Sequence, residues 1–334
     1  MSIYDAVLLA SHGGPERPDD VLPFLENVVR GKNVPRQRLL EVGRHYDLFD
    51  GVSPANAQVR ALLAALLNEL SAAGHGLPVY WGNRCWHPLL GETIKQMADD
   101  GVRRALVFVT SAYSSYPACR QYLEDIERAR QEVGPDAPQI DKLRVFYNHP
   151  GFIEPMAERV EAALAEVPPD GRDAAQLIFT AHSLPMAMAG KCAYEQQLRE
   201  ACRLVCEQIG RPQWQLVYQS RSGPPSQPWL EPDVSDALGD VARLNPGADV
   251  VIVPIGFLYE HTEIVYDLDV QARALCDELG LNMVRSAVVG CHRRFVQMIR
   301  ELIEERLTDA PTRLALGALG PGHDVCPADC CPPS

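Results

Sequence analysis

Two short segments of this chain combine side chains that can take protons from a substrate and attract a cation. In the first, an apolar run at 177–179 leads to His182, and Pro185 follows three residues later. In the second, Glu263 and Asp267 are four residues apart, so on a helix they share one face. An imidazole of near-neutral pKa accepts protons, and carboxylates attract cations. These residue types therefore suit a reaction that removes protons from a substrate and brings a metal cation to it.

A third group of reactive side chains is formed by closely spaced cysteines. Cys326, Cys330 and Cys331 lie near the end of the printed sequence, whereas the others of the 10 cysteines are scattered. Disulfides are rare in a reducing compartment, where clustered thiols are typical metal ligands. We interpret these three cysteines as metal ligands, with a structural disulfide as the alternative. Cys202 and Cys206, one helical turn apart, are interpreted as buried packing.

Short β-rich runs alternate with longer helical patterns along the chain, which is typical of parallel α/β units. The two halves of the chain repeat the same order of runs. The matching pairs are 8–15 with 178–185, 79–84 with 216–221, 105–111 with 250–256, and 143–147 with 283–287. The spacing of apolar residues predicts helices over 59–72, 194–209 and 295–307.

This repeat predicts an α/β fold of two similar doubly wound (Rossmann-like) domains, each with a four-stranded parallel sheet, and a cleft between them. The predicted domains are 1–167 and 168–310, joined by a Pro/Gly-rich linker at 166–172 and followed by a cysteine-rich tail at 311–334. Ligands of such sheets bind beyond the carboxyl ends of the strands. His12, His182 and the turn before Glu263 are all expected at such ends.

The composition argues against several classes of partner. Lys and Arg number 31 and Asp and Glu 44, so the formal net charge is −13 at pH 7, which disfavours nucleic acid. The sequence has no run that approaches the roughly 18 apolar residues of a membrane-spanning helix. The apolar stretch at 6–10 is too short for a signal peptide. We expect a cytoplasmic protein without stable membrane insertion, and a monomer.

The segments around His182 and Glu263 resemble motifs of the ferrochelatases, the enzymes of haem biosynthesis that insert ferrous iron into a porphyrin. The resemblance covers nearly the whole chain, and it implies a chelatase-type fold. It also implies that His182 accepts the pyrrole protons and that Glu263, with Asp267 behind it, forms an acidic ladder that guides iron or protons. Gln271 stands where many relatives have a third acid. Both His182 and Glu263 are expected to contact the substrate iron.

The same resemblance implies contacts with the porphyrin. His12 stands where relatives often have a tyrosine, and it is expected to face the metal from the side opposite His182, since imidazole is a good iron ligand. Two segments, 28–32 and 44–54, match a family region that lines the pocket. The candidate donors to the porphyrin propionates in these segments are Arg30, Arg44, Tyr46 and Ser53.

The terminal cysteines, with the segments 110–122 and 218–232, resemble the actinobacterial-type coproporphyrin III ferrochelatases, which carry a [2Fe-2S] cluster. The resemblance implies that Cys119 supplies the fourth ligand of such a cluster, beside Cys326, Cys330 and Cys331. Zinc suits the same thiolates and stays open as an alternative. The resemblance further implies coproporphyrin III as the substrate and coproheme as the product.

Two other functions stay open from the sequence. One is a ferrochelatase that acts on protoporphyrin IX and makes protohaem directly. The other is a tetrapyrrole-binding or iron–sulfur sensor protein that binds a porphyrin without metallating it. The joint presence of His182 and Glu263 argues against a binding protein, because binding alone does not need an acid facing a histidine. Relative turnover of the two porphyrins separates the first alternative from our interpretation.

Overall fold

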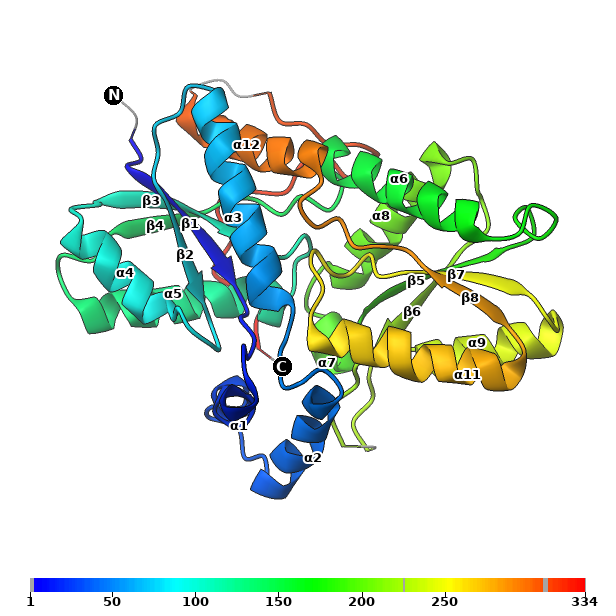
Figure 1. The fold of residues 1–334 in the computed structure, drawn as a ribbon. Helices are drawn as coiled ribbons and strands as arrows, with labels where there is room; N and C mark the ends of the chain where they lie inside the picture. The colour runs from blue at the N-terminus through cyan, green and yellow to red at the C-terminus, as the bar shows by residue number, and fades with distance from the viewer. Residues whose placement is uncertain (1–2, 225, 309–311, 334) are drawn as a thin grey trace.

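The computed structural model describes residues 3–224, 226–308 and 312–333, and Figure 1 shows its two α/β halves side by side. The first half has the sheet order β2-β1-β3-β4 and the second the order β6-β5-β7-β8, with parallel neighbours throughout. The strands are β1 (Ala6–Ser11), β2 (Val79–Asn83), β3 (Arg104–Val109), β4 (Gln139–Lys142), β5 (Gln176–His182), β6 (Gln215–Gln219), β7 (Asp249–Val253) and β8 (Asn282–Arg285). The equivalent strand orders confirm the predicted fold class.

Helices cover both faces of each sheet. The α-helices are α1 (Val21–Val28), α2 (Arg36–Asp47), α3 (Ala55–Ala72), α4 (Leu90–Asp99), α5 (Gln121–Val133), α6 (Pro150–Glu166), α7 (Met186–Ala189), α8 (Tyr194–Gln208), α9 (Val234–Leu244), α10 (Thr262–Ile264), α11 (Arg273–Leu279) and α12 (Arg293–Leu307). A 3₁₀-helix, η1 (Pro18–Asp20), and two π-helices, η2 (Tyr116–Arg120) and η3 (Val265–Ala272), complete the set in the described residues. The three helices predicted from apolar spacing correspond to α3, α8 and α12.

The strands alternate their side chains between two apolar layers, as the period of two in a β-strand requires. In β1, Val7 and Leu9 face the large central core, whereas Leu8 faces a separate cluster beneath α4 and α5. In β5, Phe179 faces the central core and Ile178 faces the cluster beneath α9 and α11. Each sheet is therefore buried on both faces, as is usual for parallel sheets.

The last helix of each half lies against the other half. Helix α6 packs against β7 and β8 of the second sheet, and α12 packs against α3 of the first half and against α6 (Figure 1). One hydrophobic core consequently contains residues of both sheets, such as Phe108 of β3 and Val253 of β7. The division of the chain at 167/168 stays a prediction, and the predicted boundary at 310/311 lies outside the described residues.

The fourth strand of the first half lies earlier in the sequence than expected. The prediction of a strand at 143–147 is wrong, because β4 ends at Lys142, which pairs with Val107. Beyond it the chain leaves the sheet and holds the C-terminal tail. Arg144 donates to the backbone oxygen of Leu314 at 2.9 Å, and Asn148 donates to that of Gly320 at 2.8 Å. The apolar character of this segment serves the central core and not a sheet edge.

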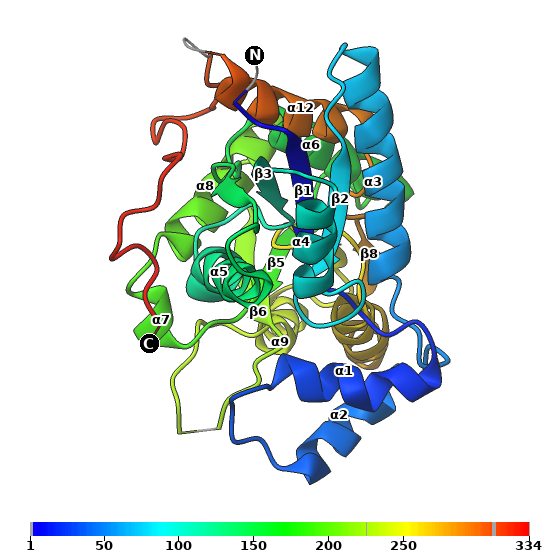
Figure 2. The same ribbon diagram turned by 90° about the vertical axis from the view of Figure 1, so that its left-hand side faces the viewer.

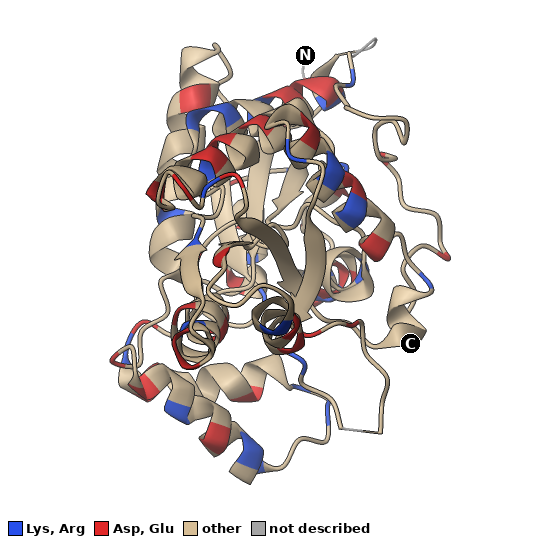
Figure 3. Ribbon diagram, turned by 90° about the vertical axis from the view of Figure 1, so that its right-hand side faces the viewer, with Lys and Arg blue, Asp and Glu red and all other residues tan. Residues whose placement is uncertain are grey.

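Helices α1 and α2 form a hairpin beyond the carboxyl ends of β1 and β2, as Figures 1 and 2 show from two sides. The hairpin has its own small core, built on Phe24, Leu25, Leu39 and Cys85. Acidic and basic residues are interspersed along the outer helices, and the strands contain few of them (Figure 3). Among the described helices, none combines the length and apolar composition that a bilayer crossing requires.

Candidate active site

His182 is the last residue of β5, and its side chain is one-third exposed. Its Nδ1 lies 2.5 Å from the backbone oxygen of Ser183. A carbonyl oxygen can only accept a hydrogen bond, so in the neutral ring Nδ1 carries the proton and Nε2 presents a lone pair. Nε2 lies 3.8 Å from Oε1 of Glu263. The two residues predicted to act together are therefore neighbours, and the histidine is oriented to accept a proton.

Glu263 and Asp267 lie on the helix that follows the β7 turn, but its winding differs from the expected α-helix. The chain makes one turn of α10 and then continues as the π-helix η3. The buried residues Ile264, Leu268 and Ala272 recur at every fourth position. A regular α-helix would rotate such residues by about 40° for every four positions. With this winding, Ile264, Leu268 and Ala272 all lie in one buried cluster with residues of β5 and β7.

Asp267 is buried more deeply than Glu263 and is held by polar neighbours. Its Oδ2 accepts a hydrogen bond from Nε2 of Gln219 at 3.1 Å and another from the hydroxyl of Ser220. Burial and the negative charge of Glu263 raise the pKa of Asp267 to about 6. This carboxyl group can therefore gain and lose a proton near neutral pH. Gln271, one step further along the same face, is exposed.

His12 lies one residue beyond β1 and meets residues of both halves. Its backbone N–H donates to the hydroxyl of Tyr259 at 3.4 Å, and its Nε2 lies 3.5 Å from Sγ of Cys85. Backbone hydrogen bonding from Cys85 N to His12 O at 2.9 Å holds the two residues together. Burial is the largest effect and lowers the pKa of His12, but the negative charge of the Cys85 thiolate and the hydrogen bonds to Cys85 and Gly13 together outweigh it, so the pKa is raised. Cys85 is a site residue that the sequence analysis missed.

His261 is a second neighbour that the sequence analysis missed. It precedes α10 in extended backbone, two positions before Glu263. Burial lowers the pKa of His261 to about 4, and the positive charges of His12 and His182 add to this effect. Three histidines thus lie within electrostatic reach of one another where the two halves meet. The position of His261, two residues before Glu263, was the feature of the sequence that could have identified it as a site residue.

The four predicted propionate donors are in different environments. The phenol of Tyr46 is close to the acidic residues, because burial and the negative charge of Glu263 raise its pKa. Arg44 is exposed on α2. The guanidinium of Arg30 donates to Asn27 of α1. Ser53 is 4% exposed, and its hydroxyl accepts from the backbone N–H of Ala55 at 3.4 Å. Tyr46 is therefore the member that lies beside the predicted catalytic pair.

The four predicted cluster cysteines come together although they are distant in the sequence. Sγ of Cys119, in η2, lies 4.0 Å from Sγ of Cys326, and Sγ of Cys330 lies 3.6 Å from that of Cys331. All described cysteines are free thiols, so the structure contains none of the disulfides considered as the alternative. Cys202 and Cys206 are buried in α8, as expected. The tail carrying the terminal thiols runs past α8 to α7 (Figure 2).

A buried lysine lies beside these thiols. Lys142 is 9% exposed, its Nζ donates to the backbone oxygen of Leu143 at 2.9 Å, and within the described chain no ion pair joins it to a carboxylate. The hydrogen bond with Cys326 lowers the pKa of the Cys119 thiol, and the positive charge of Lys142 lowers it further. A buried ammonium needs a counter-charge, which ionised thiols supply. The surroundings of Cys119 therefore favour its thiolate.

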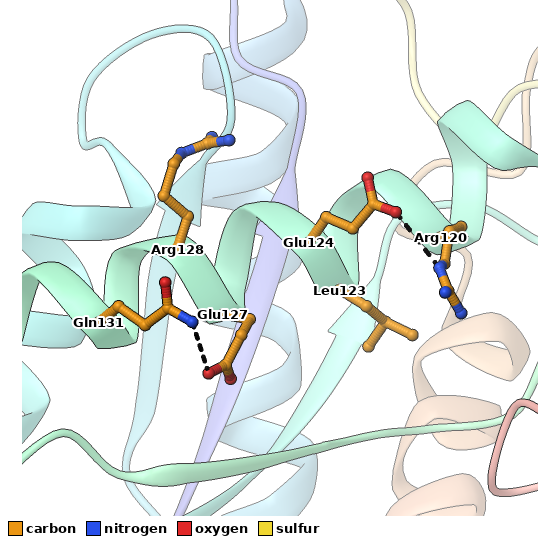
Figure 4. A pocket seen from close by; sticks show the side chains of 6 residues that line it. All are labelled: Arg120, Leu123, Glu124, Glu127, Arg128 and Gln131. Atoms are coloured by element: carbon orange, nitrogen blue, oxygen red, sulfur yellow. Dashed lines mark hydrogen bonds and ion pairs between the residues drawn. The ribbon is translucent and has the colours of Figure 1, made fainter. Parts of the chain in front are cut away.

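A surface pocket of about 320 Å³ lies on α5, away from the residues described above. Figure 4 shows its lining, in which Arg120 pairs with Glu124 and Gln131 donates to Glu127. This exposed helical face lacks nucleophiles and buried titratable groups. The histidines and acidic residues of the candidate site lie instead beyond the carboxyl ends of β1, β5 and β7.

The fold and the site define a metal chelatase with two α/β halves. A solved structure of SirB from Bacillus subtilis with Fe3+ has the same fold, with a TM-score of 0.59, 12% identity, and coverage of 92% of this chain and 97% of that one. A family model described as Ferrochelatase matches residues 4–307. The chain belongs to the ferrochelatase family, the enzymes that insert ferrous iron into a porphyrin.

Two relatives illustrate this membership. A ferrochelatase from Rhodopirellula baltica is 54% identical over 330 residues, covering 98% of this chain and 93% of the relative. A coproporphyrin III ferrochelatase from Streptomyces coelicolor is 49% identical over 353 residues, covering 99% of this chain and 94% of the relative.

Proposed function

We propose that this ferrochelatase metallates coproporphyrin III and forms coproheme. The proposal is supported by the relatives from Streptomyces coelicolor and Nocardia farcinica, both named coproporphyrin III ferrochelatase and each 49% identical over nearly the whole chain. The observation that carries the chemistry is the 3.8 Å approach of His182 Nε2 to Glu263. A proton acceptor and a carboxylate at this distance can serve the two tasks of the reaction, which are deprotonation of the macrocycle and delivery of the cation.

In the proposed reaction, ferrous iron replaces two pyrrole protons, so the porphyrin gains Fe2+ and releases two H+. His182 accepts a pyrrole proton at Nε2 while its Nδ1–H stays bonded to Ser183 O. The carboxylate of Glu263 stabilises the resulting imidazolium and guides the incoming cation. Positioning of both groups around the reacting nitrogens would supply much of the rate enhancement. No redox step is needed, because iron enters and leaves as Fe2+.

Asp267 is proposed to pass protons away from the pyrrole nitrogens. Its pKa of about 6 allows it to receive a proton from Glu263 and release it to solvent at neutral pH. The row of acids would end there, since Gln271 cannot ionise. A short ladder of this kind is better suited to moving protons than to storing several metal ions.

The remaining candidate residues are proposed to contact the porphyrin. His12 would face the macrocycle from the first half. Tyr46 and Ser53 offer hydroxyl groups, and Arg30 and Arg44 offer guanidinium groups, to the propionates. Coproporphyrin III carries four carboxylates where protoporphyrin IX carries two. Because the chain has a net charge of −13, local arginines would be needed to hold such an anion.

Anaerobic metallation with purified protein tests these assignments. We expect ferrous iron to enter coproporphyrin III faster than protoporphyrin IX, with loss of activity in His182→Ala and Glu263→Gln. Glu278→Gln, an exposed carboxamide substitution on α11, is the matched control and should retain activity. A clear preference for protoporphyrin IX would overturn the substrate assignment. Tight porphyrin binding without metallation would favour a binding protein.

We also propose that Cys119, Cys326, Cys330 and Cys331 hold a [2Fe-2S] cluster. The donor set fits this group, because the thiols form two close pairs and each iron of such a cluster takes two ligands. Lys142 would offset part of its negative charge. Bound there, a cluster would supply one-electron chemistry and would fasten the tail to η2. The proposed reaction with porphyrin does not pass through it.

Iron and acid-labile sulfide analysis tests the cluster independently of activity. The wild-type protein, purified anaerobically, should contain both, and Cys330→Ser should lose them together with the visible absorption. Cys291→Ser removes an exposed thiol elsewhere and serves as the control. Full iron and sulfide content in Cys330→Ser would refute this ligand assignment. Bound zinc without sulfide in the wild type would favour the zinc alternative.

A further inference from the structure

A histidine lies among the terminal cysteines that neither the proposed cluster nor the metallation reaction uses. His323 is exposed on the tail, and its Nε2 lies 3.9 Å from Sγ of Cys330. The ligand atoms of His323, Cys326 and Cys330 all lie within 4.8 Å of one another. Three donors from one eight-residue stretch thus converge without any contribution from the rest of the chain.

The distances suit a single metal ion. With zinc–sulfur bonds of about 2.3 Å and tetrahedral angles, two thiolate ligands lie about 3.8 Å apart. Cys119 lies 4.0 Å from Cys326, close to that separation. A mixed set of one imidazole and three thiolates is among the usual ligand sets of structural zinc.

We propose that, when no cluster is assembled, the protein binds one divalent metal ion of the zinc type through His323, Cys326, Cys330 and Cys119. Binding releases the protons of the three thiols and forms one metal–nitrogen and three metal–sulfur bonds. The site shares three thiols with the proposed cluster, so the two occupants exclude each other. The proposal goes beyond the cluster, because it requires His323 and not Cys331.

Cys119 is chosen as the fourth ligand because of its neighbours. Its Sγ lies 4.0 Å from Sγ of Cys326. The buried ammonium group of Lys142 lies beside it, and a metal-bound thiolate would supply the counter-charge of that group. The metal would join the tail to η2 through Cys119.

The backbone around His323 is already held in place. Arg313 donates to the backbone oxygen of Gly322 and to Oδ1 of Asp324, the latter at 3.1 Å. Gly322 lies against Val145, where an added Cβ would come within 2.8 Å of a side-chain carbon. Gly322 is therefore held against the first half, and Asp324 is held by Arg313 of the tail. A ligand held in this way loses less conformational entropy when the metal binds.

Cobalt titration tests the site with a spectroscopic readout. The protein is freed of metal and cluster with chelator under reducing, anaerobic conditions, and Co2+ is added as the probe, followed by displacement with Zn2+. We expect thiolate-to-cobalt charge-transfer bands and the visible bands of tetrahedral cobalt at one equivalent. His323→Ala should weaken binding by more than about tenfold. Cys331→Ser should bind as tightly as the wild type.

The two variants together keep the proposal falsifiable. Because His323 is exposed, its replacement should leave the fold intact, which circular dichroism can verify. Wild-type affinity in His323→Ala, or loss of the cobalt bands in Cys331→Ser, would overturn the proposal. Failure of the cluster is measured separately, as absence of acid-labile sulfide in the purified wild type. Sulfide in the purified protein without cobalt binding in the metal-free protein would contradict only the single-metal site. Cobalt binding without sulfide would contradict only the cluster.

Discussion

The hydroxyl of Tyr194 donates a 3.1 Å hydrogen bond to the backbone oxygen of His182. It thereby holds the last residue of β5 against the start of α8. A second buried tyrosine, Tyr113, donates to the backbone oxygen of Ile255 at 3.0 Å, in the turn that leads to Glu263. The rings of the two tyrosines meet edge to face, with centroids 6.1 Å apart. One buried aromatic contact thus supports the backbone at His182 and the turn that precedes Glu263.

Replacement of Tyr194 by phenylalanine should impair catalysis more than substrate binding. The ring would stay in place, but the His182 carbonyl would lose a hydrogen-bond donor, which typically costs about 1 kcal/mol. We expect a lower kcat with little change in KM for the porphyrin, and an altered pH profile. Tyr218→Phe is the control, since the buried hydroxyl of Tyr218 has no hydrogen-bond partner in the described residues. Equal kcat values in the two variants would contradict the positioning role.

Asp267→Asn should change the pH dependence of stability. The pKa of Asp267 is raised from 3.8 to about 6, so between these values the folded state binds more protons than the unfolded state. The wild type therefore loses stability as pH rises through this window. At 1.36 kcal/mol per pKa unit the loss is at most about 3 kcal/mol. Asparagine keeps an acceptor for Ser220 and Gln219 but does not ionise.

Urea unfolding at a series of pH values measures this effect. Asp267→Asn should be more stable than the wild type above pH 6 and should match it below about pH 4, where both side chains are neutral. Asp277→Asn, on the exposed surface of α11, should follow the wild type at every pH. A variant that is less stable than the wild type at pH 7 would show that the carboxylate of Asp267 is stabilised by its neighbours.

Removal of the Glu305 carboxylate should strongly destabilise the fold. Arg144 and Glu305 form a two-point ion pair at 2.7 and 2.8 Å, with side chains 1% and 5% exposed. In Glu305→Ala the guanidinium would remain buried without its counter-charge, at a cost of about 3–5 kcal/mol. Glu195→Ala breaks an exposed pair with Arg199 and should cost below about 1 kcal/mol. Chemical unfolding of both variants provides the comparison, and similar losses would contradict the assignment.

Cys85→Ser should lower the pKa of His12. Burial lowers that pKa, and the negative charge of the Cys85 thiolate together with its hydrogen bond to the imidazole, 3.5 Å away, raises it. Serine does not ionise in this range, so burial would dominate in the variant. Titration of the His12 ring protons by NMR measures the change, with Cys276→Ser as a control in a separate buried thiol. An unchanged titration would mean that Cys85 is a neutral thiol.

Much of the fold follows from local sequence patterns, because strands such as β1, β5 and β7 are apolar runs. The position of β4 did not follow, since the apolar residues at 143–147 pack in the central core and carry the tail instead of pairing in the sheet. The π-winding of η3 was also not predicted. Apolar residues four positions apart are compatible with an α-helix, so their spacing does not distinguish the two windings.

The clustered cysteines were predicted from their residue type and spacing. His182 and Glu263 were predicted from their places in the chain and from the resemblance to ferrochelatase motifs. Cys85, His261 and His323 were not predicted, because their significance depends on neighbours brought close by the fold. His261 lies near His12 of the other half, and Cys85 meets His12 through the pairing of β1 and β2. These contacts join residues that are distant in the sequence, so they cannot be predicted from residue spacing.

The exchange of α6 and α12 between the halves limits how the polypeptide can be divided. A cut near residue 167 would release a first fragment whose α6 has lost the strands beneath it, and a second fragment with β7 and β8 uncovered on that side. Each fragment would expose aliphatic and aromatic side chains to water and would tend to aggregate. Co-expressed fragments could bury these surfaces against each other. The duplicated halves are thus expected to reassemble as a complementing pair, although neither should be stable alone.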